Sequence, residues 1–496
     1  MPLMSLPDPA TERPVQADAL PDLSAVEAVD AMRRGDLKAE DYAAALLERT
    51  ARCAALNAFR TLDANDVLAA AREADRQRLR GRPPGKLHGL PIPVKDSINT
   101  RRLPTSNGAR LLAHHRPRGD AGVLQPLFGA GALLLGKTNL HELSCGWTSN
   151  NAAFGAVLNP YDPSRTPGGS SGGSAVAVAS RMAPLALGED TFGSIRVPAT
   201  FCGVAGLRPT HERYPNDGVM PLSRGRFDQV GPLARSVADL ALFDEVLTRA
   251  DGPIAALPLA GIRIGVSPQR LVESLDPACE RLYQDALRRL RAAGATIVAA
   301  EVPALLAEAS ATEQIILNQE LLGSIADYLE AQEAGVTLDA LIEDAGPNLR
   351  PVFAAGRRPG PHEAYAAALG ACEEIRAAAA AYFREHSLDA LAFPPTLMPA
   401  LTQGDSTSVT LAGRPVDLFT AIGRNVAIGS CADLASLVLP MGLAGGLPVG
   451  LEFDAPSGSD RRLLAFGLSL EKALGPIAPP PSAVDQGASR TVTVTP

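Results

Sequence analysis

Short apolar runs that alternate with helical stretches are the feature that most constrains how this chain can fold. The runs read as buried strands, and residues with helical spacing lie between them. Strands are predicted at residues 90–94, 131–136, 260–266, 295–302 and 388–393, and helices at 125–128, 236–250 and 277–293. This alternation predicts an α/β protein with a parallel or mixed central sheet.

The regions around this pattern are predicted to be helical. An amphipathic helix is expected after Asp22, with Ser24 as its N-cap, and two more are expected at residues 39–55 and 64–80. Residues 303–385 are also mostly helical and lie between two strand-like runs. We therefore predict that they form an insertion on the sheet.

Residues 434–451 carry no charged side chain, and by length alone they could form a transmembrane helix. Pro440, Pro448 and four glycines would break such a helix repeatedly. We therefore predict two strands joined by a loop, and no membrane association. The first 21 residues lack the apolar stretch of a signal peptide, so a cytoplasmic location is expected.

The overall charge and the scarcity of metal-binding patterns narrow the functional classes. The net charge of −8 argues against nucleic-acid binding, and the most basic stretch, residues 76–86, is predicted to be a solvated loop. The six cysteines form no C-x-x-C motif and the seven histidines form no H-x-x-x-H motif. Neither a metal nor a cofactor is therefore predicted.

Two short motifs match known signatures and are interpreted as chance matches. Residues 131–138 fit the phosphate-binding loop pattern, but the four middle residues are one Ala and three Leu, which read as a strand. Residues 169–173 fit the nucleophile motif of α/β-hydrolases, but no histidine with a recognisable acidic partner follows.

A glycine- and serine-rich run at residues 166–174 is the most unusual stretch of the chain. It reads Thr-Pro-Gly-Gly-Ser-Ser-Gly-Gly-Ser and continues to Ser180 as a helix of small residues. A flexible linker is the alternative interpretation, but linkers rarely continue into an apolar helix in the middle of a domain. The run brings several backbone N–H groups and hydroxyls close together, as a reactive site requires.

A lysine upstream could serve such a site as a base. Lys95 ends an apolar run, and burial favours the neutral form of a lysine, which can accept a proton. A serine hydroxyl needs a base of this kind because it is a weak nucleophile. For Lys95 alone, a structural ion pair with Asp96 is the alternative.

These motifs together resemble the amidase signature family. The family shows G-x-P-x-x-x-K-D, then G-G-S-S-G-G-S, then D-T-G-G-S-x-R, and this chain has counterparts of all three in that order. The resemblance implies one α/β domain whose mixed central sheet is covered by helices on both faces. The expected boundaries are an N-terminal arm at 1–22, the domain at 23–476 with a substrate-shaping insertion at 303–385, and a disordered tail at 477–496.

The resemblance also implies a mechanism. Ser194 would be the nucleophile, Ser170 a bridging serine that often follows a cis peptide bond in this family, and Lys95 the general base. A proton would pass from Ser194 through Ser170 to Lys95 as Ser194 attacks the carbonyl carbon, and it would return to the leaving nitrogen. Water would then release the acid from the acyl-enzyme.

The loop around Ser194 would complete the site. The oxyanion hole would consist of backbone N–H groups, and three further side chains would support the loop. The donors would belong to Thr191, Phe192, Gly193 and Ser194, and the supporting residues would be Ser171, Asp190 and Arg196.

Two residues of this loop depart from the family pattern. Phe192 stands where the family usually has glycine, and Glu189 stands where it commonly has Thr or Ser. If the position of Phe192 requires a positive φ, the side chain costs about 1–2 kcal/mol. Its ring could also narrow the acyl pocket.

The predicted activity is hydrolysis of an amide C–N bond in a small molecule, extending to aryl amides, esters or carbamates. Two alternatives stay open: the amidase subunit of a tRNA-dependent glutamine amidotransferase, and a non-catalytic binding module on the same scaffold. The leading interpretation requires no protein partner and leaves a homo-oligomer open.

Overall fold

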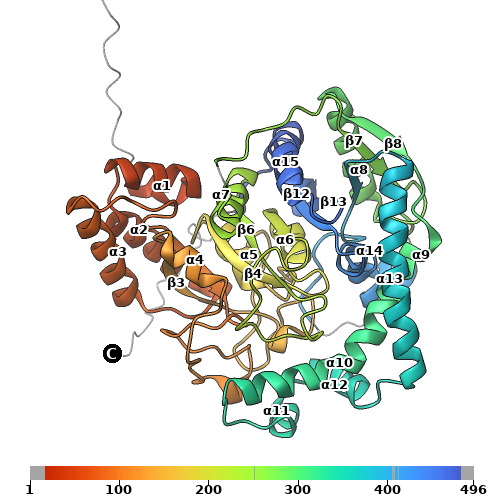
Figure 1. Cartoon of the computed structure of the whole chain (residues 1–496), viewed down its shortest axis with the longest axis horizontal. Helices are drawn as coiled ribbons and strands as arrows, with labels where there is room; N and C mark the ends of the chain where they lie inside the picture. Colours follow the sequence, from red (N-terminus) through yellow and green to blue (C-terminus); the bar gives the residue numbers. More distant parts are fainter. Residues whose placement is uncertain (1–16, 251, 405–407, 412, 482–496) are drawn as a thin grey trace, which may run out of the picture.

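A mixed sheet of eleven strands runs through the middle of the molecule, which is described here from a computed structural model (Figure 1). Its strands are β1 (Phe59–Thr61), β2 (Pro91–Lys95), β3 (Leu133–Thr138), β4 (Leu185–Asp190), β5 (Ala205–Arg208), β6 (Gln229–Ala234), β7 (Arg263–Val266), β8 (Thr296–Ala299), β9 (Ala390–Phe393), β12 (Ala435–Ala444) and β13 (Leu447–Ala455). Their order is β1-β3-β2-β4-β6-β5-β12-β13-β9-β7-β8. Because β2 pairs in parallel with β3 and β4 while β4 pairs antiparallel with β6, the predicted mixed α/β sheet is confirmed.

The structure describes residues 17–250, 252–404, 408–411 and 413–481. Of the predicted arm, only the 3₁₀ helix η1 (Ala17–Asp22) is described, and of the predicted tail only residues 477–481. The remainder of both segments lies outside the described residues.

Helices pack on both faces of this sheet. One face carries α4 (Leu124–Gly129), α7 (Val237–Thr248), α8 (Pro277–Ala292) and α15 (Asp460–Leu474), with α1 (Ala25–Arg34), α2 (Ala39–Arg52) and α3 (Ala64–Leu79) beyond them, and the other carries α5 (Gly172–Ala179) and α6 (Arg196–Cys202). Alternation along β4 explains the two layers, since Leu185 and Leu187 join the core that includes α7 whereas Ala186 joins the core that includes α5.

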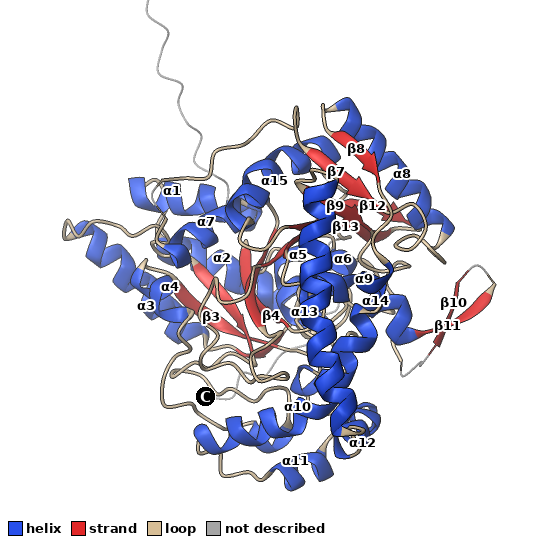
Figure 2. Cartoon of the chain, turned by 45° about the vertical axis from the view of Figure 1, so that its right-hand side comes forward, coloured by secondary structure: helices blue, strands red, loops and turns tan. Residues whose placement is uncertain are grey.

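The insertion predicted at residues 303–385 is helical, as expected. It contains α9 (Ala304–Ala307), α10 (Ala309–Ala331), α11 (Leu338–Asp344), α12 (Arg350–Arg357) and α13 (His362–Glu385). Helix α10 packs against α12, α13 and α14 (Leu418–Cys431), as the side view in Figure 2 illustrates. A separate hairpin of β10 (Ser408–Leu411) and β11 (Arg414–Asp417) projects from the body in this view.

Local predictions at both ends of the domain are confirmed. Ser24 caps α1 in a capping box with Glu27, and the run at 434–451 forms the antiparallel pair β12–β13. The turn between these strands uses Gly445 and Gly446 at φ values of 59° and 85°, which side-chain-bearing residues rarely adopt. Among the described helices, none is long and apolar enough to cross a membrane.

The prediction of a loop throughout residues 76–86 is wrong at its start. Arg76 and Arg78 lie in the last turn of α3, which continues to Leu79. Basic side chains are favourable there because a helix C-terminus carries partial negative charge, and Arg76 also pairs with Glu73 at 2.7 Å. The basic composition therefore marked a helix end rather than a connector.

Candidate active site

The glycine- and serine-rich run lies buried at the start of α5, and the linker interpretation is wrong. Ser170 and Ser171 have no exposed surface, and the peptide bond between Gly169 and Ser170 is cis. A Cβ on Gly173 would lie 2.3 Å from the carbonyl oxygen of Asn139, so only glycine lets the helix approach that strand end. The run is thus a rigid part of the core.

Lys95, at the end of β2, contacts this run directly. Its Nζ lies 2.7 Å from Ser170 Oγ, 2.8 Å from Glu189 Oε2 and 3.3 Å from the Glu189 carbonyl oxygen. The alternative ion pair of Lys95 with Asp96 does not occur, because Asp96 pairs with Lys137 on β3 at 3.1 Å. Strand alternation accounts for this, since neighbouring residues of a strand point to opposite faces.

Ser194 lies in the loop between β4 and α6 and retains 5% of its surface exposed. The backbone N–H of Ser171 donates to the Ser194 carbonyl oxygen at 3.1 Å, which ties this loop to the serine-rich run. The structure thus brings Lys95 and Ser170 into contact and places Ser194 beside them at the wall of a pocket.

Asp190 and Arg196 hold the loop in place from below. Asp190 accepts hydrogen bonds from the N–H groups of Gly193 and Ile195 at 2.8 and 3.0 Å, and its carboxylate pairs with Arg196 at 3.0 Å. Burial alone would raise the pKa of Asp190, but the positive charges of Arg196 and Arg208 outweigh it and hold that pKa well below its usual range. Both Asp190 and Arg196 are fully buried, which fits the supporting role expected of them.

The backbone donors near Ser194 differ from the expected set in one respect. The Gly193 N–H already donates to Asp190, so the expected oxyanion hole narrows to the N–H groups of Thr191, Phe192 and Ser194. Within the described residues, no hydrogen-bond acceptor is found for these three groups. The positive φ of the loop, +89°, falls on Gly193, and Phe192 is absent from the described non-glycine residues with positive φ. The anticipated strain at Phe192 therefore does not arise.

A pocket of about 170 Å³ opens at Ser194. Three of its walls are aromatic: the rings of Trp147, Phe192 and Phe419 pack with centroids 5.1–5.3 Å apart. The indole N–H of Trp147 donates to the Phe192 carbonyl oxygen at 2.7 Å, which fixes the side chain. The remaining lining residues are Ser144, Cys145, Gly146, Thr191, Leu222, Gln314, Leu317, Asn318, Leu321 and Val352.

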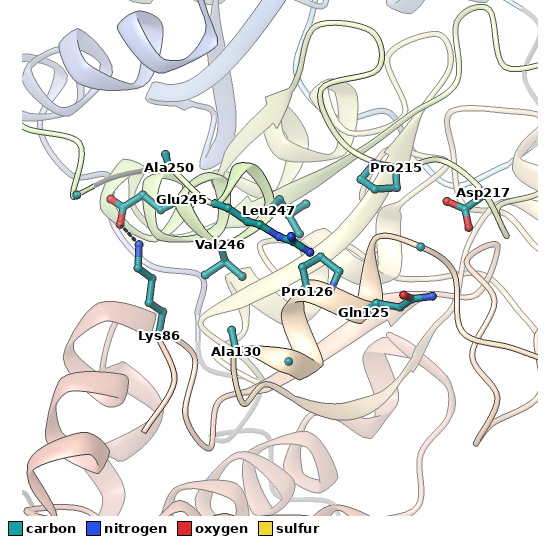
Figure 3. A pocket seen from close by; sticks show the side chains of 14 residues that line it. Lys86, Gln125, Pro126, Ala130, Pro215, Asp217, Glu245, Val246, Leu247 and Ala250 are labelled. Carbon is teal, nitrogen blue, oxygen red and sulfur yellow. Dashed lines mark hydrogen bonds and ion pairs between the residues drawn. The ribbon is translucent and has the colours of Figure 1, made fainter. Parts of the chain in front are cut away.

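A larger hollow of about 1160 Å³ lies elsewhere on the molecule (Figure 3). Its walls come from the region of α4 and the end of α7, and Lys86 pairs across it with Glu245 at 3.5 Å. Neither Lys95 nor a serine lines it. Size alone would therefore point to the wrong site.

Sequence reasoning missed three contributors to this site. It singled out Glu189 as a departure from the family but not as the ion-pair partner of Lys95, which lies 94 positions away in the chain. It also missed Trp147 and Phe419. The only signal for them was that Trp147 is the single tryptophan of a chain with few aromatic residues.

Comparison with known proteins decides the family. The family model described as Amidase matches residues 41–464. The chain belongs to the amidase signature family. It is 37% identical over 460 residues to an indoleacetamide hydrolase of Agrobacterium vitis, covering 92% of this chain and 98% of that protein. It is 35% identical over 481 residues to a mandelamide hydrolase of Pseudomonas putida, covering 93% of each.

Solved structures agree with this assignment. A crystal structure of an amidase superimposes with a TM-score of 0.82 at 31% identity, covering 91% of this chain and all of that one. A glutamyl-tRNA(Gln) amidotransferase subunit from Chloroflexus aggregans is also similar, at 35% identity over 463 residues, covering 88% of this chain and 93% of that protein. Family membership makes the chain an amidase, an enzyme that hydrolyses the C–N bond of an amide.

Proposed function

We propose that this amidase hydrolyses small arylalkyl amides through a Ser194 acyl-enzyme, with Ser170 and Lys95 as its proton relay. The observation that carries the proposal is the 2.7 Å contact between Lys95 Nζ and Ser170 Oγ, buried directly behind Ser194. A lysine base explains how a serine nucleophile works here without a histidine.

The proposed steps balance in protons and bonds. Ser194 Oγ attacks the amide carbon as its proton moves to Ser170 Oγ, and Ser170 passes its own proton to Lys95 Nζ. The relay then runs backwards, the leaving nitrogen takes a proton, and the C–N bond breaks. Water attacks the resulting ester by the same relay, and the acid leaves. Donors fixed at the carbonyl oxygen contribute about 3–4 kcal/mol each in comparable sites.

The lining of the pocket supports an aromatic acyl group. Trp147, Phe192 and Phe419 offer ring faces and edges beside Ser194, and Leu317 extends this apolar surface. The names of the relatives, indoleacetamide hydrolase and mandelamide hydrolase, are in line with such a substrate. Esters and carbamates of the same acyl shape fall within the proposal, because an acyl-enzyme can form from each of them.

A substrate panel tests the proposal. The purified chain should hydrolyse indole-3-acetamide or mandelamide at least about tenfold faster, in kcat/KM, than an aliphatic amide of similar length. A fluorophosphonate should label the wild-type chain on Ser194, and Ser194→Ala should neither label nor turn over. A well-folded wild-type chain that takes no label would contradict the mechanism, and a preference for the aliphatic amide would contradict the substrate class.

The same assay separates the two alternatives. Activity that appears only with a partner protein and glutamine would instead favour the amidotransferase role, since the chain is also similar to a subunit of such an enzyme. Neither labelling nor activity with any amide would favour a binding module. We also propose a cytoplasmic location, supported by the six cysteines, which are all free thiols.

A further inference from the structure

Glu189 supplies two of the three hydrogen-bond partners of Lys95. Its carboxylate oxygen Oε2 lies 2.8 Å from Lys95 Nζ, and its own backbone carbonyl oxygen lies 3.3 Å away. The third partner is Ser170 Oγ at 2.7 Å. Lys95 has no exposed surface and Glu189 retains 1%, so water does not compete for these contacts.

This arrangement fixes the direction of the lysine nitrogen. An amine nitrogen is tetrahedral, so two N–H bonds aimed at two acceptors of one residue leave the remaining direction defined. That direction points to Ser170 Oγ. In the neutral form it carries the lone pair that accepts the Ser170 proton, and in the charged form it carries the third N–H. Glu189 therefore determines where the base points in both states.

Glu189 is itself held rigidly. Its second carboxylate oxygen, Oε1, lies 2.7 Å from Thr191 Oγ1, which is also 2.7 Å from Asp228 Oδ1. Its backbone N–H donates to Ser171 Oγ at 3.2 Å, and that hydroxyl donates to the Glu189 carbonyl oxygen at 3.0 Å. The carboxylate is thus pre-oriented before any substrate binds, as an electrostatic contribution to catalysis requires.

Other titratable groups around the pair keep their charge state across the working pH range. Burial, with the positive charge of Lys95, lowers the pKa of His141 to about 4. Burial, with the negative charge of Glu189, raises the pKa of Cys145 to about 12. Asp228 faces the pair through Thr191. A pH response between these limits can therefore be assigned to the pair itself.

We propose that Glu189 is a positioning residue of the relay, which aims Lys95 at Ser170 and serves as counter-ion to the ammonium formed on proton transfer. The inference rests on the proposed function, because it concerns the same relay. When Ser170 passes its proton to Lys95, the nitrogen changes from amine to ammonium in a site without water, and the fixed carboxylate neutralises that charge. The aspartate of a Ser-His-Asp triad has the same two tasks for histidine.

The test is the pH dependence of kcat/KM for Glu189→Gln. An adjacent carboxylate favours the ammonium, so its removal should shift the acid limb of the profile to lower pH by about 1–3 units. The plateau should fall by about 10²-fold, because the counter-ion is lost. Glu189→Asp, which retains the charge, should keep its acid limb within about half a unit of the wild-type position. Glu245→Gln removes another buried, ion-paired carboxylate far from Lys95 and should leave the profile unchanged.

The outcomes separate this inference from the function it rests on. An acid limb in Glu189→Gln at the wild-type position would overturn the inference, even if the plateau fell, because a merely structural role lowers activity without moving the limb. If Glu189→Gln does not fold, an acid limb in Glu189→Asp displaced like that of an uncharged site would overturn it instead. Absence of amide turnover and of fluorophosphonate labelling in the wild type would refute the proposed function itself.

Discussion

Two buried lysines on neighbouring strands of this protein face opposite fates. Lys95 on β2 and Lys137 on β3 both lack exposed surface, and each pairs with a carboxylate, Glu189 at 2.8 Å and Asp96 at 3.1 Å. Lys137 also donates to the Ile98 carbonyl oxygen at 2.8 Å and to Thr105 Oγ1 at 2.6 Å. Burial lowers the pKa of Lys137, and Asp96 acts in the opposite direction.

The difference lies in what the third partner leads to. Every partner of Lys137 belongs to the surrounding loop and strand, so its hydrogen bonds end in the scaffold. The third partner of Lys95 is the hydroxyl of Ser170, which adjoins the loop of Ser194 and its pocket. A buried ion pair is therefore no sign of catalysis in itself. The onward connection to an exchangeable proton makes the distinction.

The largest expected effect is the loss of turnover in Lys95→Met. Without a base, kcat/KM should fall by about 10⁴-fold. Because the variant strands the Glu189 carboxylate, the double variant Lys95→Met/Glu189→Gln should recover thermal stability but no activity. Steady-state kinetics with thermal melts measures both. Substantial turnover in either variant would show that Lys95 is as structural as Lys137.

Lys137→Met should have the converse effect. Removing one partner of a buried pair leaves the Asp96 charge uncompensated, so we expect the free energy of unfolding to fall by about 3–5 kcal/mol. The kcat of the folded fraction should stay close to wild type, because Lys137 does not reach the pocket. Denaturant titration and active-site titration together measure this. A large loss of kcat without loss of stability would erase the contrast between the two lysines.

The smallest expected effect concerns the pocket, which only the Lys95 side possesses. Phe419→Ala removes one aromatic wall, and the specificity constant for an arylalkyl amide should fall by about 10–100-fold while that for a short aliphatic amide changes less. Leu317→Ala in the same pocket is the matched control, since it removes apolar surface without removing a ring. Equal losses for both substrates would indicate general damage instead of acyl-group recognition.

Much of the fold was predictable from local patterns. The proline and glycine positions in 434–451 correctly excluded a membrane helix, and the apolar runs located β2, β3, β7, β8 and β9. The strand order was not predictable, because β4 inserts between β2 and β6 by pairings between distant segments. Short strands such as β5 carry too few residues for a pattern.

The site was predictable where motifs are local and unpredictable where contacts are distant. Ser170, Ser171 and Ser194 stand in recognisable motifs, whereas Glu189 reaches Lys95 only through the pairing of β4 with β2. Likewise, Phe419 meets Trp147 only because α14 folds back over the loop. The commitment of the Gly193 N–H to Asp190 depends on loop geometry that no residue spacing encodes.

The sealing of Lys95 and Ser170 behind Ser194 imposes an order on the chemistry under the proposed mechanism. Protons can enter and leave the relay only across the Ser194 oxygen, so the departing amine must carry one away before the relay can act on anything else. Whatever next occupies the emptied space decides the product. Water gives the acid, whereas a small amine or hydroxylamine gives a new amide. Hydrolysis and acyl exchange are thus competing exits from a single intermediate, and their ratio follows the concentration of the incoming nucleophile.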